Sequence, residues 1–152
     1  MATFGTYVSG QILTAAELNA GLPTCVLTNT SVALLNGVAQ QIPFTTEVTD
    51  LNGWHSTSSN TSRITPNIAG TYLITMQIND VAGTTRALIS CYKNGANQTI
   101  PIQTDTTGIF DDFSAVGFTT ANGTTDYFEM TALVTGANKT AVVQFSLTRI
   151  SS

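Results

Sequence analysis

The residues best suited to chemistry are a histidine and a tryptophan in one polar segment. His55 is the single histidine of the chain; it follows Trp54 and begins the stretch HSTSSNTSR, residues 55–63. A Ser-His-Asp site would require this imidazole to be held by an acid and directed at a serine. Its position in a polar loop instead favours a surface residue, or a residue at the edge of an interface between copies of the chain. Trp54 could form a sugar-binding receptor loop with these neighbours, but the favoured interpretation is that it closes one end of the fold.

Carboxylates offer a second kind of site. The segment TDTTGIFDD contains Asp105, Asp111 and Asp112, whose oxygen atoms could hold calcium. Their spacing matches no EF-hand loop, and Cys25 and Cys91 have no metal-ligand spacing. The sequence also lacks a phosphate-binding loop, an HExxH motif and a paired-carboxylate signature. We therefore expect no enzyme and no cofactor, with calcium near the three aspartates as an open alternative.

Charge excludes several classes of partner. Charged residues make up 9% of the 152 residues, whereas about 25% is usual, and the net charge is −4. No Lys/Arg cluster is available for nucleic acid, and no apolar run approaches the roughly 20 residues that span a membrane. The opening MATFGTYVSG lacks the basic and apolar regions of a signal peptide, so we expect reduced thiols. A surface so poor in charge suits either an assembly or a neutral monomer.

Most of the chain alternates with a period of two, as β-strands do. In TYLITMQI, residues Tyr72, Ile74, Met76 and Ile78 share a face, and in TAVVQFSLTRI the residues Val143, Phe145 and Leu147 do so. QIPFTTEV is expected to place Ile42, Phe44, Thr46 and Val48 on one face. Asn-Gly pairs and other turn signals separate these runs. The pattern predicts an all-β sandwich or barrel.

One short segment has helical features instead. In SGQILTAAELNAG, residues 9–21, Thr14 and Glu17 form a capping box, and Leu13, Leu18 and Leu22 give one apolar side. A helix of about two turns is not stable alone, so it needs a partner surface. We therefore divide the chain into an N-terminal attachment arm, residues 1–23, and a β-domain, residues 24–152.

The order of motifs in the β-domain resembles a known family. IPFTTEVTDLNGWH, SRITPNIAGTYLITMQI, ISCYKNG and FTTANGTTDYFEMTAL follow one another as in the jelly-roll of the complement globular-head and tumour-necrosis-factor family. The chain departs from the family pattern at Ile64, where Phe is frequent, and at Thr125-Asp126, where Gly-Asp is usual. The resemblance implies a TNF-like jelly-roll β-sandwich that forms a homotrimer.

Several strands are apolar on both faces, which indicates a second buried surface besides the core. The resemblance places that surface at a three-fold interface. The residues expected there are aromatic or large and aliphatic: Tyr72, Ile74, Tyr92, Phe128 and Phe145.

The opening segment resembles a different group of proteins. SGQILTAAELNAG is similar to the N-terminal segment of many tailed-bacteriophage fibre and virion structural proteins. It implies a virion protein assembled in the host cytoplasm, either a tail-fibre or receptor-binding knob or a capsid decoration (head fibre) protein. The arm would bind another virion protein, and a host-surface glycan or protein is a further candidate partner. The attachment residues would be Phe4, Tyr7, Ile12, Leu13, Leu18 and Leu22. The alternative is a cellular TNF-like or carbohydrate-binding module.

Overall fold

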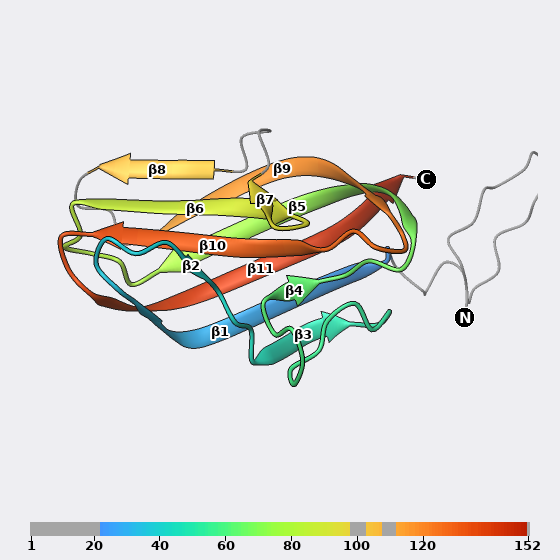
Figure 1. Ribbon diagram of the computed structural model, residues 1–152, viewed down its shortest axis with the longest axis horizontal. Coiled ribbons are helices and arrows are strands. Elements are labelled where there is room, and N and C mark those ends of the chain that lie inside the picture. The colour runs from blue at the N-terminus through green and yellow to red at the C-terminus, as the bar shows by residue number, and fades with distance from the viewer. Residues whose placement is uncertain (1–21, 98–102, 108–111, 152) are drawn as a thin grey trace, which may run out of the picture.

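The computed structural model describes residues 22–97, 103–107 and 112–151. Their strands are β1 (Thr24–Leu34), β2 (Gln40–Gln41), β3 (Thr46–Asp50), β4 (Arg63–Ile64), β5 (Ala69–Asn79), β6 (Arg86–Lys93), β7 (Ala96–Asn97), β8 (Gln103–Thr107), β9 (Phe113–Asn122), β10 (Phe128–Thr135) and β11 (Lys139–Ser151) (Figure 1). These described ranges contain no helix, and so none that could cross a membrane. The prediction of an all-β domain is confirmed, while the helix expected at residues 9–21 lies outside the described residues.

The strands form two antiparallel sheets that pack face to face (Figure 1). One sheet has the order β3-β1-β11-β5-β9, so the first long strand lies beside the last. The other has the order β2-β10-β6-β7, with β4 also pairing with β10 and β8 with β6. Consecutive strands often lie in opposite sheets, as in a jelly-roll sandwich. The five-stranded sheet therefore joins segments from both ends of the described chain.

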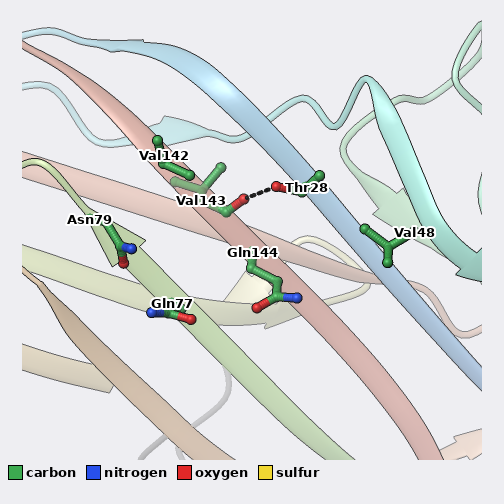
Figure 2. Close-up of a pocket in the computed structure, with 7 residues that line it drawn as sticks. All are labelled: Thr28, Val48, Gln77, Asn79, Val142, Val143 and Gln144. Carbon is green, nitrogen blue, oxygen red and sulfur yellow. Dashed lines mark hydrogen bonds between the residues drawn. The ribbon is translucent and has the colours of Figure 1, made fainter.

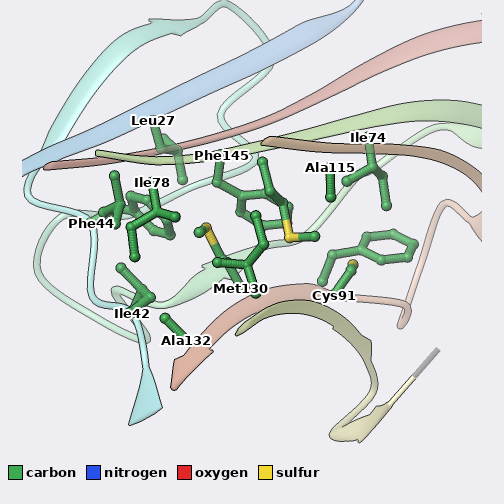
Figure 3. Close-up of a cluster of buried hydrophobic side chains, with 14 of the residues drawn as sticks. Leu27, Ile42, Phe44, Ile74, Ile78, Cys91, Ala115, Met130, Ala132 and Phe145 are labelled. Carbon is green, nitrogen blue, oxygen red and sulfur yellow. The ribbon is translucent and has the colours of Figure 1, made fainter. Parts of the chain in front are cut away.

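The core lies between the two sheets and follows the predicted alternation. Every second side chain of β5, from Tyr72 to Ile78, is buried, and so is the Val143-to-Leu147 series of β11. Figure 3 shows side chains from both sheets meeting in this layer. Phe44 stacks on Phe145, with ring centroids 5.8 Å apart. Burying an aliphatic or aromatic side chain of this size stabilises a fold by about 1.5–3 kcal/mol, so this layer holds the sheets together.

One predicted strand face is wrong. Ile42 and Phe44 are buried, but Thr46 and Val48 are exposed. The chain passes here from β2 in one sheet to β3 in the other, so residues 42–44 cover the edge of the core. Thr46 then lies opposite Thr28 of β1, and the register shifts between Val26 and Leu27, which lie opposite Thr49 and Glu47, so that Val48 is the extra residue of a bulge. Period two holds only within one sheet, and this segment leaves one sheet for the other.

The turn between β9 and β10 shows why the sequence has Asn122 and Gly123 at this point. The side-chain oxygen of Asn122 accepts hydrogen bonds from the backbone N–H groups of Thr124, Thr125 and Asp126, each at 3.0 Å. Gly123 has φ = 73°, and a Cβ atom there would collide with the backbone of Ala69. Only glycine combines this left-handed conformation with such a close approach.

Candidate functional site

The outer face of the five-stranded sheet carries no charge. The charged residues of its five strands are Glu47, Asp50, Lys139 and Arg149. They lie opposite Leu27, Cys25, Leu34 and Tyr72 respectively, all of which are buried in the core. Because residues opposite each other in antiparallel strands point to the same side, all four charged positions belong to the inner side of the sheet. The outer side is left with hydroxyl, amide and apolar groups only. We call it the uncharged face.

Two exposed apolar residues of β9 stand on the uncharged face. Val116 is 58% exposed and Phe118 is 55% exposed, and they lie opposite Thr75 and Leu73 of β5. Next to them, the hydroxyl groups of Thr75 and Ser146 are 2.6 Å apart and hydrogen-bonded. Aromatic residues are enriched and charged residues depleted at the centres of protein interfaces, so this composition suits contact with another protein.

A hollow of about 210 Å³ lies in the same face (Figure 2). Its walls come from four strands: Thr28, Val48, Gln77, Asn79, Val142, Val143 and Gln144. The hydroxyl of Thr28 donates to the carbonyl oxygen of Val143 at 3.1 Å. Among the described residues, the side-chain oxygen of Asn79 is buried and has no hydrogen-bond partner. A buried acceptor left unpaired costs free energy, so this oxygen makes the wall of the hollow less stable than a fully paired one.

The interface residues predicted from the sequence need correction. Tyr72, Ile74, Phe128 and Phe145 are 0% exposed in a single chain, so their side chains are core residues and not surface groups. Tyr72 also donates its hydroxyl hydrogen to the carbonyl oxygen of Ile68 at 2.5 Å, and burial raises its pKa to about 12. Tyr92 is half-buried in β6, on the other sheet, opposite Glu129. Any contact through the five-stranded sheet must therefore use its outer residues.

Trp54 and His55 hold the loop that follows β3 in place. Trp54 is 2% exposed, packs edge-on against Tyr72 and donates its indole N–H to Asn67 at 2.8 Å. The carboxylate of Asp50 accepts hydrogen bonds from the backbone N–H groups of both Trp54 and His55. The indole is thus covered and offers no plate for a sugar ring, which agrees with the favoured interpretation that Trp54 closes the fold.

The imidazole of His55 also serves the loop. Its Nδ1 lies 2.8 Å from the carbonyl oxygen of Arg63, and its Nε2 lies 3.3 Å from that of Phe44. Both ring nitrogens therefore face backbone oxygens, and neither is directed at a serine hydroxyl. The ring thus connects the loop to the start of β4, at Arg63, and to the residues before β3, at Phe44. It is paired with no nucleophile.

Glu129 is a buried acid on the outer side of β10 that the sequence did not single out. It is 1% exposed, and its oxygens accept hydrogen bonds from Gln41, Ser62 and Arg63 at 3.0–3.1 Å. The Arg63 guanidinium also lies 4.0 Å from the ring centre of Tyr127. These partners account for both carboxylate oxygens, so Glu129 ties β2 and β4 to the sheet.

Asp126 plays a similar structural role at the turn between β9 and β10. It accepts hydrogen bonds from Asn94 and the Asn122 backbone and forms an ion pair with Lys93 at 2.9 Å. Burial would raise the pKa of Asp126, but these hydrogen bonds and the Lys93 charge outweigh it and lower the pKa. The carboxylate is held ionised and links two turns.

The remaining predicted sites are only partly described. Asp105 lies in β8 opposite Leu88, Asp112 accepts a hydrogen bond from the backbone of Asp80 at 3.3 Å, and Asp111 lies outside the described residues. Within the part of the chain that the structure covers, no group of three or more potential metal ligands occurs. Calcium binding near these aspartates thus stays an open alternative.

The arm residues Phe4, Tyr7, Ile12, Leu13 and Leu18 also lie outside the described ranges, whereas Leu22 lies inside them and is 48% exposed. Cys25 and Cys91 are both free and buried. Burial raises the pKa of both thiols, to about 12 for Cys91, so neither is activated as a nucleophile.

No protein-family model matches the chain, and no curated protein sequence matches it significantly. Solved structures do. The chain is similar to PRD1 vertex protein P5, with a TM-score of 0.67 and 12% identity, covering 86% of this chain and 99% of that one. The globular domain of zebrafish complement 1qA gives a TM-score of 0.61 at 13% identity, covering 84% and 97%. Murine APRIL gives 0.53 at 14% identity, covering 84% and 99%. The described chain is thus a jelly-roll sandwich of the type found in complement globular heads and TNF-like proteins.

Proposed function

We propose that the protein is a structural component of a tailed-bacteriophage particle, a homotrimer whose jelly-roll is displayed on the surface. The virion role is supported by the similarity of residues 9–21 to phage fibre and virion proteins. It is further supported by the shared fold with a protein whose name identifies it as a vertex protein. The arm, residues 1–23, holds the particle, and the domain is either a tail-fibre knob or a capsid decoration protein.

The uncharged face is the observation that carries self-association. A surface with Phe118 and Val116 more than half exposed and no charge to solvate is costly to leave in water. Identical copies can share it without like-charge repulsion, because every charged side chain of the sheet is on its other side. The three-fold arrangement follows from the resemblance to the complement and TNF family.

A second candidate is a cellular TNF-like or carbohydrate-binding module. The similarity to the complement 1qA domain and to APRIL favours its first form. The covered indole of Trp54 weighs against a sugar site built on that residue. This alternative leaves the phage-like opening segment without a role.

Labelling of intact particles tests the proposal. Antibody raised against the purified protein should decorate gradient-purified particles of the phage that encodes it, and added soluble protein should compete the label away. Particles of an unrelated phage, processed in parallel, are the control and should stay unlabelled. If the protein is found only in the unassembled fraction of an infected-cell lysate, it is not a virion component.

A further inference from the structure

Three exposed apolar side chains gather at the end of the sandwich where β1 begins. Leu22 is 48% exposed, Leu51 is 73% exposed and Ile150 is 43% exposed. They come from three separate stretches of the chain: the residues before β1, the turn after β3, and the end of β11. We call these three residues the base patch.

Backbone pairing places the members of the base patch around one point. The carbonyl oxygen of Pro23, directly after Leu22, accepts a hydrogen bond from the Arg149 N–H at 2.9 Å. Cys25 lies opposite Asp50, the residue before Leu51. Because neighbouring strands are about 4.8 Å apart, Leu51 and Ile150 stand on either side of the start of β1, with the chain entering between them.

The segment that enters there has an apolar side of matching character. In residues 9–21 the expected helix begins at the cap Thr14 and carries Leu18, and Leu22 follows Leu18 by four residues. Leu13 directly precedes the cap, the position from which an apolar residue packs against Leu18. Leu22 thus belongs both to the apolar side of the segment and to the base patch. A helix of about two turns gains its stability from packing, so it requires a surface of this kind.

We propose that the apolar side of residues 13–21 packs on the base patch of the same chain. Tethering decides the occupant, because Leu18 is joined to Leu22 by three residues and closing so short a loop costs little entropy. A separate protein would have to compete with a segment held permanently beside the patch. The packed segment then fixes the direction in which residues 1–12 leave the domain. This narrows the proposed attachment residues to Phe4, Tyr7 and Ile12, because Leu13, Leu18 and Leu22 are used within the chain.

Proteolysis of the isolated 152-residue chain tests whether the segment packs on the base patch. Glu17 is the single acidic residue among residues 1–21, so cleavage after glutamate gives one diagnostic fragment from the segment. The double variant L51S/I150S should be cleaved after Glu17 about tenfold faster than the wild type. Removing two apolar side chains of the base patch raises the fraction of molecules in which the segment is detached. Leu35→Ser is the matched control, since Leu35 is 49% exposed at the far end of β1; its cleavage rate should equal that of the wild type.

A second variant probes the other side of the contact. Leu18→Ser should accelerate cleavage by a similar factor, and adding it to the double variant should give no further increase, as expected for groups in one contact. Equal rates in the wild type and in L51S/I150S would overturn the proposal. Protection that falls on dilution would also overturn it, by assigning the seat to a neighbouring copy. The assay contains no particles, so its outcome is independent of whether the protein is found on virions.

Discussion

Phe118 of β9 and Leu73 of β5 lie directly opposite each other, and both point away from the core. Their backbone positions place them in the same row as Thr148 of β11 and Thr24 of β1. This row crosses most of the uncharged face and has a large apolar group at one end and hydroxyl groups at the other. It is the part of the molecule in which a charge would do most to oppose contact between copies.

Replacing Phe118 by Lys should therefore abolish self-association without unfolding the domain. The side chain is 55% exposed, so the core is untouched, while a charge buried in an interface costs several kcal/mol. Light scattering at micromolar concentration should give three times 16.0 kDa for the wild type and 16.0 kDa for the variant. Leu35→Lys, on the opposite end of the sandwich, should keep the wild-type mass. A wild-type mass of a single chain would refute self-association altogether.

Removal of the His55 ring should weaken the fold and not an activity. His55→Ala removes a ring that lies between two backbone oxygens and whose single N–H, in the neutral form, can donate to one of them, so we expect the free energy of unfolding in urea to fall by about 1 kcal/mol. Thr57→Ala, in the same loop and exposed, should change it by less than about 0.5 kcal/mol. Identical stability of His55→Ala and the wild type would mean that the ring does not stabilise the loop.

Asp126 should make stability depend on pH in the acid range. Its pKa is lower in the folded protein than in the unfolded chain, where it is about 3.9. Its contribution is therefore complete above that value and is lost as the pH falls through the folded pKa. Asp126→Asn should cost about 2 kcal/mol at pH 7 and progressively less as the pH is lowered below the unfolded value, measured by urea unfolding at neutral and acid pH.

The control for this pH effect is Asp80→Asn. Asp80 is exposed with φ = 67°, a conformation that asparagine tolerates, so its replacement should cost little at either pH. A loss in Asp126→Asn that is the same at both pH values would assign the effect to geometry and not to the charge.

Both thiols should be unreactive toward a thiol reagent in the native state. The pKa of Cys91 is raised to about 12 and that of Cys25 is raised further, so little thiolate exists at pH 8, and both sulfurs are covered. An aromatic disulfide reagent should react with two thiols per chain in denaturant and with neither on the same timescale in buffer. Rapid modification of one thiol in the folded protein would show that its strand opens locally.

The strands could be predicted from the sequence because alternation is a local property. Tyr72 and Ile74 share a face of their strand as the alternation predicts, although that face lines the core and not the interface expected of it, and the jelly-roll expected from the order of motifs is the fold observed. The edge at Val48 could not be predicted, because the alternation there is interrupted by a change of sheet.

The candidate interface was harder to predict for a different reason. Alternation says which residues share a face, but not which face is inside when both are apolar. In β9 the small Ala115 and Thr119 point inward while Val116 and Phe118 point outward, so side-chain size misleads. Only the register with β5 settles the matter, and register depends on residues far away in the chain.

The pairing of β1 with β11 makes the two ends of the domain different. Thr24 lies opposite Thr148, so β1 begins and β11 ends at the same end of the domain. The Trp54 loop is near that end, because Trp54 packs on Tyr72, which lies opposite Arg149. The other end is built from residues 35–38, 80–85 and 136–138, where Gly37 and Asn36 bond to Val134 and Asn138. A molecule anchored through its N-terminal arm therefore holds the Trp54 loop close to its support and turns Leu35 and Val38, both exposed, outward to meet whatever approaches.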